Sequence, residues 1–232
     1  MNNKAFVFCF SFIISHLSFI ISLMVRTKRV STIGTDFEDE ARARGFHLIA
    51  GVDEVGRGAL AGPVVAGAVI LDPARAWPEG LDDSKKLSPA RRERIAAELR
   101  KTALAFAIGS VPATEIDRDN ILVATRRAMC AALQQLQPAA DFLLIDALQL
   151  RECALPQRAI IHGDAISASI AAASVVAKTY RDQLMRDYDA QFPLYGFAAH
   201  VGYGTRFHLE ALRRHGACPL HRRSFRGVLN DV

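Results

Sequence analysis

Three short segments that each end in an acidic residue set the strongest limit on how this chain folds. HLIAGVDE ends at Glu54, DFLLID ends at Asp146 and RAIIHGD ends at Asp164. The last two are almost wholly apolar, which is typical of strands that are buried on both faces, as in a parallel sheet. We therefore expect an α/β domain in which acidic side chains stand at the ends of strands.

The rest of the chain predicts further strands and helices around this sheet. The glycine-rich bend after Glu54 leads into an apolar, β-branched run, which predicts a hairpin. Ser88 and Pro89 are typical of a helix start, and the helical spacing after Asp164 places that acid at a helix N-terminus. Strands are expected over 64–71 and 102–111, and helices over 36–44, 89–101 and from 117 or 120 to 137. This order indicates a central mixed β-sheet flanked by helices, with a helical C-terminal extension.

Length and composition fit one globular domain with an appendage. The 232 residues are 50% hydrophobic and 23% charged, values that exclude a disordered, collagen-like or coiled-coil chain. The cysteines contain no C-x-x-C pair, so we expect neither a disulfide scaffold nor a thiolate zinc site. Scattered cysteines of this kind fit a reducing compartment. They are Cys9, Cys130, Cys153 and Cys218.

The segment from Ala5 to Val25 is apolar and, at about 21 residues, long enough to cross a bilayer as a helix. No small-x-small cleavage site follows it, which disfavours a secretory signal. Two interpretations stay open. The segment is a membrane anchor, or it is an upstream extension of the reading frame with Met24 as the true initiator, which we favour. Basic residues after the segment would leave the rest of an anchored chain in the cytoplasm, so both interpretations keep the chemistry there.

The net charge of +5 is modest, but arginines gather near the C-terminus. Between Thr205 and Arg226 only Glu210 is acidic. The arginines of this stretch are Arg206, Arg213, Arg214, Arg222, Arg223 and Arg226. We interpret this tail as a surface that faces a polyanion rather than as a merely solvated helix.

The acids at the strand ends are the candidate catalytic residues. Ligands gather at the carboxyl ends of strands in open α/β sheets, so these acids can converge there. They repel one another unless cations neutralise them or their pKa values rise, and hard oxygen ligands suit Mg²⁺ or Mn²⁺. Two such ions about 4 Å apart can activate a water and stabilise the leaving oxygen in phosphodiester hydrolysis. The candidates are Asp53, Glu54, Asp146 and Asp164.

Each acid also has a purely structural interpretation. Asp164 can be a helix N-cap and Asp146 a turn cap, while Asp53 or Glu54 can pair with Arg57. Adjacent residues of a strand point to opposite faces, so Asp53 and Glu54 share one site only if the strand twists or ends between them.

The loop GRGALAG follows directly, with glycines at Gly56, Gly58 and Gly62. Its spacing and the strand after it do not fit a dinucleotide-binding turn, which needs a helix there. The glycines allow backbone N–H and C=O groups to approach a ligand closely, with Arg57 beside them. Such a loop can read a sugar edge, and the 2′-hydroxyl is the group that distinguishes RNA from DNA.

Six segments, taken in order from about Ile49 to Phe225, resemble bacterial ribonuclease HII. They are GVDEVGRGALAGPVVAGAVIL, LDDSKKLSPARRE, FLLIDAL, IHGDAISASIAAASVVAKTYRD, YGFAAHVGYGTRFHLEALRRHG and HRRSF. The resemblance implies a ribonuclease H-like fold that uses two Mg²⁺ or Mn²⁺ ions per site. It implies that the metal-binding carboxylates are Asp53, Glu54, Asp146 and Asp164. The implied activity is hydrolysis of the RNA strand of RNA–DNA hybrids and incision 5′ of single ribonucleotides in duplex DNA, leaving 3′-hydroxyl and 5′-phosphate ends.

The resemblance also implies residues that bind substrate. Gly56, Arg57 and Gly58 match the loop that contacts the ribonucleotide 2′-hydroxyl and its neighbouring phosphate. Tyr203 matches the tyrosine that stacks at the junction and helps to check that the next sugar is deoxyribose. Val201 stands where family members often have lysine, which removes a phosphate contact.

Other charged residues are weaker candidates. Lys85 and Lys86 are either solvated loop residues or phosphate contacts, and Lys178 is either a helix-surface lysine or a neighbour of the metals. The histidines have no metal-ligand spacing, and we interpret them as ordinary residues of the basic tail. They are His200, His208, His215 and His221.

With this resemblance, the chain divides into four parts. Residues 1–23 are the apolar N-terminal extension, 24–46 a polar segment, 47–190 the ribonuclease H-like catalytic domain and 191–232 a basic helical substrate-binding region. We expect a cytoplasmic monomer with no small-molecule cofactor and no membrane association, acting on RNA–DNA hybrid and ribonucleotide-containing duplex DNA. A membrane-tethered form stays open because of the apolar extension.

Two rivals remain beside this interpretation. A ribonuclease HIII-like enzyme would carry an extra N-terminal substrate-binding domain and a G-K-G loop, but the stretch between Met24 and Ile49 is short and Arg57 is present. A non-catalytic hybrid-binding module would keep the basic tail and lose acids, yet all four acids are here.

Overall fold

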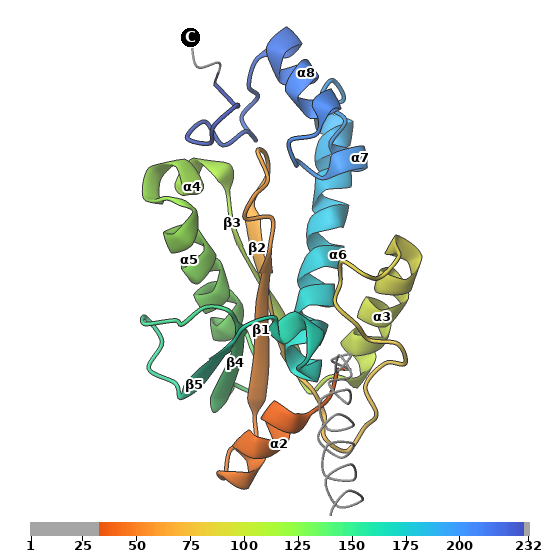
Figure 1. The fold of residues 1–232 in the computed structure, drawn as a ribbon, viewed down its shortest axis with the longest axis vertical. Helices are drawn as coiled ribbons and strands as arrows, with labels where there is room; N and C mark the ends of the chain where they lie inside the picture. Colours follow the sequence, from red (N-terminus) through yellow and green to blue (C-terminus); the bar gives the residue numbers. More distant parts are fainter. Residues whose placement is uncertain (1–32, 230–232) are drawn as a thin grey trace, which may run out of the picture. The chain divides into compact units, whose positions relative to one another are not determined.

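A computed structural model of the chain describes residues 33–229, so the expectations for residues 1–23 and for Met24 lie outside the described residues. Five strands form one sheet in the order β3-β2-β1-β4-β5 (Figure 1). The strands are β1 (Ile49–Val55), β2 (Val64–Ile70), β3 (Ala105–Val111), β4 (Phe142–Asp146) and β5 (Gln157–Ile160). The first three pair antiparallel, whereas β4 pairs parallel to both β1 and β5. The predicted mixed sheet is confirmed.

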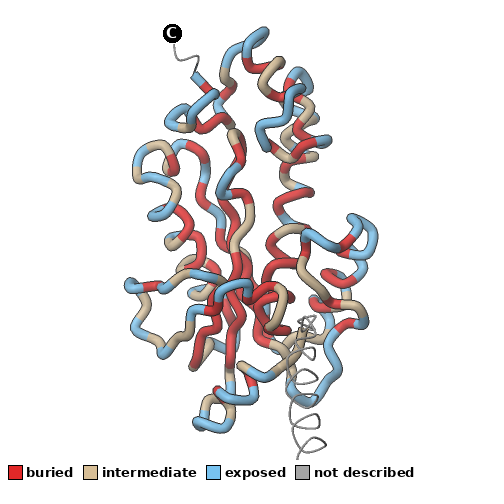
Figure 2. Tube along the Cα trace, viewed as in Figure 1, coloured by how far each residue is buried: buried red, intermediate tan, exposed pale blue. Residues whose placement is uncertain are grey.

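Helices cover both faces of this sheet, with α5 on one face and α6 and α3 on the other (Figure 1). The helices are α2 (Asp36–Ala43), α3 (Pro89–Thr102), α4 (Ala113–Asp119), α5 (Ile121–Gln134), the short 3₁₀ helix η1 (Gly163–Ala165), α6 (Ala168–Gln191), α7 (Phe197–His200) and α8 (Arg206–His215). Ser88 caps α3 as predicted, because its hydroxyl accepts the Arg91 N–H. The central strands β1, β2 and β4 and the sheet-facing side of α6 are largely buried, whereas β3 and β5 at the two edges of the sheet are partly exposed (Figure 2).

Of the two starts predicted for the helix that reaches residue 137, the one at 120 is confirmed, because α5 begins at Ile121. A separate helix, α4, precedes it and was not predicted. Asn120 separates them, because its φ of 74° lies in the left-handed region and interrupts the helical path. Its side chain then accepts the N–H groups of Leu122 and Val123 and caps α5.

Two glycines of the sheet allow α6 to lie directly against it. A Cβ on Gly51 of β1 would collide with the backbone carbonyl of Ser169, and one on Gly67 of β2 would lie 2.5 Å from the carbonyl oxygen of Ala173. The α6 alanines from Ala171 to Ala173 have no exposed surface, so they too allow close packing. The start of α6 is therefore held against Gly51, in the amino-terminal half of β1.

The prediction that Asp164 ends a strand and begins a helix is wrong. β5 ends at Ile160, and Asp164 lies in the 3₁₀ turn η1. The long helix α6 begins only at Ala168, because the Ser167 hydroxyl accepts the Ile170 N–H and occupies the N-cap position.

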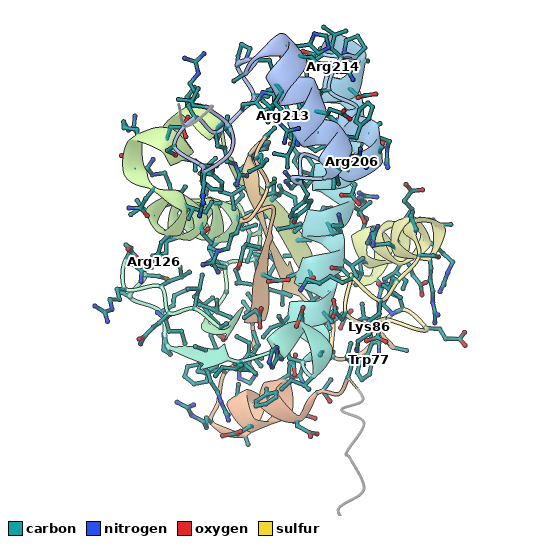
Figure 3. All side chains as sticks on the ribbon, turned by 45° about the horizontal axis from the view of Figure 1, so that its top comes forward. Trp77, Lys86, Arg126, Arg206, Arg213 and Arg214 are labelled. Carbon is teal, nitrogen blue, oxygen red and sulfur yellow. The ribbon has the colours of Figure 1, made fainter. Side chains whose placement is uncertain are left out.

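The C-terminal part of the described chain contains α7, α8 and an irregular segment. Arg206, Arg213 and Arg214 are exposed on α8 (Figure 3), in agreement with a surface that faces a polyanion. The same expectation for Arg222 is wrong. This side chain is fully buried and donates to the carbonyl oxygens of Gly62 (3.0 Å) and Arg57 (2.8 Å).

Three of the histidines interpreted as ordinary tail residues are also buried. The exposed fractions are 8% for His200, 0% for His208 and 2% for His221. They pack among the aromatic rings of Tyr195 and Phe197, so they form part of a small second core. Only His215, at the end of α8, is exposed as expected.

Acid is therefore expected to weaken this second core. Burial and then the charge of His208 lower the pKa of His221 to about 4. Below about pH 6.5 the unfolded chain binds a proton that the folded chain excludes, so stability falls as pH drops from about 6.5 toward 4. The loss is roughly 3 kcal/mol for this group.

Urea unfolding at pH 7.0 and 4.5 measures this loss. We expect a His221→Gln variant to show a smaller decline than the native chain, whereas a His215→Gln control declines as the native chain does. Equal declines in all three proteins would contradict the assignment.

No helix within residues 33–229 has both the length and the apolar character needed to span a membrane.

Candidate active site at the ends of β1 and β4

The parallel pairing of β1 with β4 brings two of the acids side by side. Val52 is paired with Ile145, so the next residues along the two strands are Asp53 and Asp146. Asp53 is buried and Asp146 is half-buried. The parallel pairing of β1 and β4 therefore places these two carboxyl groups side by side at the carboxyl ends of the strands.

Glu54 joins them, although it follows Asp53 on a strand that continues to Val55. The Glu54 N–H donates to Asp53 Oδ1 at 2.8 Å, and the charge of Asp146 raises the pKa of both residues. The two neighbours thus act on one site without the strand ending between them.

Asp164 reaches the site through the turn that precedes α6. The Gly163 N–H donates to Asp146 Oδ1 at 2.8 Å, which ties η1 to the end of β4. Asp164 itself is 5% exposed, and its charge raises the pKa of Asp146. All four predicted acids therefore belong to one electrostatic cluster.

The cluster is destabilised as long as its members are charged. Burial, followed by the charge of Glu54, raises the pKa of Asp53 well above its usual value. Burial also raises the pKa of Glu54 and of Asp146, although Arg57 lowers the first and the Gly163 N–H lowers the second. Buried carboxylates in this state favour either a proton or a cation.

Two basic side chains at the rim supply part of the missing positive charge. Arg57 contacts Glu54 Oε1 at 3.1 Å, so the structural interpretation of that pair is confirmed. Lys85 Nζ contacts Asp164 Oδ2 at 3.0 Å. Burial opposes the charge of Lys85, but the hydrogen bond and the charge of Asp164 outweigh it and raise its pKa.

Among residues 33–229, no three His, Cys, Asp or Glu side chains are arranged so that they could hold a metal ion as they stand. The donor set nevertheless fits a divalent ion, because it consists of carboxylate oxygens. Glu54 Oε2 is buried and accepts no hydrogen bond from any residue in the described part of the chain. Ion binding therefore requires the carboxylates to reorient away from Lys85 and Arg57.

The glycine loop lies beside these acids, and the buried Arg181 side chain supports it. Gly56 has a φ of 87°, and a Cβ there would collide with the Arg181 guanidinium. Arg181 donates to the carbonyl oxygens of Pro63, Val201 and Ala61. Gly58 differs, because it has neither a left-handed backbone nor any atom within 4 Å of an added Cβ.

These two glycines give a matched pair of predictions. Gly56→Ala is expected to destabilise the fold by about 1–3 kcal/mol, because its Cβ overlaps a buried side chain and its backbone is strained. Gly58→Ala is expected to leave stability within about 0.5 kcal/mol and to weaken substrate binding if a ligand uses the open space. Thermal unfolding and substrate titration of both variants check this. A Gly58→Ala protein that binds substrate as the native chain does would contradict a role for that space.

The other predicted substrate-binding residues are more dispersed. Lys86 pairs with Asp82 at 3.2 Å on an exposed surface, and Lys178 contacts Asp182 at 2.6 Å rather than the acidic cluster. Tyr203 is 37% exposed, and the Arg181 guanidinium lies 5.7 Å from its ring centroid.

Sequence reasoning missed the buried arginines that support the loop. Arg181 and Arg222 are both 0% exposed, and together they donate to five backbone carbonyls around residues 57–63 and 201. A signal for Arg181 was present, because it follows Ala173 and Ala177 at intervals of four on the buried side of α6. Arg222 lies in an irregular segment, where no periodic pattern marks burial.

Comparison with known proteins identifies the family. The family model for ribonuclease HII matches residues 50–228. The chain belongs to the ribonuclease HII family. Ribonuclease HII of Ruminiclostridium cellulolyticum is 53% identical over 189 residues, which cover 82% of this chain and 74% of the relative. Ribonuclease HII of Geobacillus kaustophilus is 55% identical over 192 residues, covering 83% and 73%.

Solved structures support the fold independently. Ribonuclease H2 of Pyrococcus horikoshii superposes with a TM-score of 0.65 at 24% identity, covering 78% of this chain and 95% of that one. The predicted ribonuclease H-like fold is confirmed. As a member of the ribonuclease HII family the chain is a ribonuclease H, a divalent-metal-dependent endonuclease, and its family supports activity on RNA–DNA hybrids.

Proposed function

We propose that this ribonuclease HII cuts the RNA strand of hybrids and also incises duplex DNA on the 5′ side of a single embedded ribonucleotide, leaving 3′-hydroxyl and 5′-phosphate ends. The observation that carries the proposal is the meeting of four acids from β1, β4 and η1 at one sheet edge, beside a glycine loop with open space at Gly58. Two divalent ions, Mg²⁺ or Mn²⁺, are part of the proposal.

The four acids are assigned as the ligands of these ions. When bound, such ions lower the pKa of a water and stabilise the leaving oxygen of a phosphodiester. Asp53 is assigned as the shared ligand, since it is buried and interacts electrostatically with both Glu54 and Asp146. Lys85 and Arg57 pair with Asp164 and Glu54 in the free protein, and these carboxylates would turn away from them when cations bind.

Substrate selection is assigned to the glycine loop and to Tyr203. Gly56, Arg57 and Gly58 would contact the ribose 2′-hydroxyl and its phosphate, and Tyr203 would stack on the following deoxyribose. Lys85, Lys86 and Lys178 are also assigned to substrate binding. The exposed arginines of α8 would bind phosphates without sequence preference, so affinity should fall steeply with salt.

The wider organisation also remains a proposal. We assign residues 47–190 to catalysis and 191–232 to substrate binding, in a cytoplasmic monomer that uses no small-molecule cofactor. A membrane-tethered form depends on the segment from Ala5 to Val25, which lies outside the described residues.

The deciding experiment uses the purified protein, Mg²⁺ and a DNA duplex with one ribonucleotide. We expect incision on the 5′ side of that ribonucleotide and none in the all-DNA duplex of the same sequence. If the protein cuts a continuous hybrid but does not incise at the single ribonucleotide, the proposed incision at embedded ribonucleotides is rejected, whereas activity on RNA–DNA hybrids stands.

A further inference from the structure

Three buried histidines pack together next to the Tyr203 segment, with His208 hydrogen-bonded to His221 and stacked on His200, and the chemistry of the acids does not use them. His200 ends α7, His208 lies in the first half of α8, and His221 lies in the irregular segment that follows. The rings of His200 and His208 stack with centroids 4.4 Å apart. His208 Nε2 and His221 Nε2 are separated by 3.0 Å.

The backbone around these rings determines which nitrogen carries each proton. His221 Nδ1 accepts the Cys218 N–H at 3.0 Å, so a neutral His221 carries its proton on Nε2. That proton points at His208 Nε2, which must therefore be the acceptor. The remaining His208 nitrogen, Nδ1, carries a proton and donates to the carbonyl oxygen of Tyr203 at 3.0 Å.

The position of the ring proton on His200 is determined in the same way. Its Nδ1 accepts the Gly202 N–H at 3.2 Å, so its Nε2 carries the proton and donates to the Tyr195 carbonyl at 2.8 Å. An extra proton on any of the three rings would place a donor against a donor. The network is therefore complete only when all three histidines are neutral.

The surroundings favour this neutral state. The ionisable groups next to the rings are the Tyr195 phenol, the His215 imidazole at the edge of Tyr195, and Cys218, whose backbone N–H is the group that contacts His221. The Arg181 guanidinium lies over the Tyr203 ring, 5.7 Å from its centroid. Burial is the largest cause that lowers the pKa of His208 and of His221, and no carboxylate in the described part of the chain acts on either.

The network ends on the segment that carries Tyr203. The Tyr203 carbonyl accepts both His208 Nδ1–H and the Thr205 N–H. One residue earlier, the Gly202 carbonyl accepts the Leu60 N–H at 2.8 Å, which connects this segment to the glycine loop. His208 therefore hydrogen-bonds to the backbone of a segment that is itself connected to the glycine loop.

We propose that His208, oriented by His221, is a positioning residue that fixes the backbone of Tyr203 for stacking on the substrate. The proposal rests on the proposed function, because it gives Tyr203 its role at the junction. The residue acts through one carbonyl group, so it affects selection of the substrate rather than the reacting atoms.

Two substitutions of His208 separate positioning from simple loss of packing. Asparagine places its amide nitrogen near the position of Nδ1 and keeps the donor to the Tyr203 carbonyl. Glutamine places its amide near the position of Nε2 and keeps only the link to His221. His215→Gln is the matched control, since it changes an exposed histidine of the same helix.

The readout is kcat/KM on a duplex with one ribonucleotide and on a continuous hybrid. We expect His208→Gln to lower kcat/KM roughly tenfold on the single-ribonucleotide duplex, which corresponds to about one hydrogen bond. The decrease on the hybrid should be smaller. His208→Asn and His215→Gln should stay within about twofold. Equal losses in both His208 variants, or equal losses on both substrates, would overturn the positioning role.

A second measurement keeps the inference independent of activity. Nitrogen-15 NMR of the histidines at pH 7 should show the proton on Nδ1 of His208 and on Nε2 of His200 and His221. Any other tautomer overturns the inference. A native protein that shows these tautomers but does not cut the single-ribonucleotide duplex would instead reject the proposed function.

Discussion

Replacing Asp53 with asparagine is expected to lower the cleavage rate by at least roughly a thousandfold while binding of the substrate duplex changes little. The amide has the shape of the carboxyl group but lacks its charge, so it is a poor ligand for a divalent ion. Asp53 lies at the centre of the acidic cluster, where both Glu54 and Asp146 act on its pKa. The residues assigned to the substrate lie elsewhere and remain unchanged.

The control for this variant is Asp82→Asn, which removes one carboxylate from an exposed pair with Lys86. Single-turnover cleavage and fluorescence anisotropy, each at a fixed salt concentration, measure the two quantities. An Asp53→Asn protein that cleaves within tenfold of the native rate would place the reaction centre elsewhere.

Gly51→Ala is expected to destabilise the fold by about 3 kcal/mol or more, at the upper end of overpacking effects. Its Cβ would collide with the backbone carbonyl of Ser169 at the start of α6. Backbone cannot rotate away as a long side chain can, so the helix must move off the sheet. The acids depend on that contact, since η1 and Asp164 directly precede α6.

Urea denaturation of Gly51→Ala against Gly34→Ala tests this. A Cβ on Gly34 meets only Asp36 Oδ1, at 3.9 Å, so that control should unfold almost as the native chain does. Equal midpoints for the two variants would mean that the packing of α6 on β1 does not require a glycine at position 51.

The parts of the fold that follow from local pattern could be predicted from the sequence. The strands around Asp53 and Asp146 are short apolar runs, and burial on both faces leaves such runs few alternatives. The cap of Ser88 is a local hydrogen bond. The acids were found because strand ends that lie far apart along the chain meet at one edge of a sheet.

What could not be predicted depends on contacts between distant segments. Asp164 was misplaced because helical periodicity does not show whether Asp164 or Ser167 begins the helix. Arg222 and His208 have polar side chains, which sequence patterns assign to the surface. Their burial comes from backbone carbonyls and ring nitrogens that other segments supply, and no periodic pattern in the sequence records those partners.

Binding of Mn²⁺ to the metal-free protein tests the central claim most directly, since the claim is that divalent ions relieve the repulsion among Asp53, Glu54, Asp146 and Asp164. Thermal unfolding at pH 7.5 should show a midpoint that rises with Mn²⁺ concentration in the native chain and in Asp82→Asn, because a ligand of the folded state stabilises it. The rise should be lost or greatly reduced in Asp53→Asn and Asp146→Asn. An equal rise in all four proteins would contradict a metal site at the ends of β1 and β4.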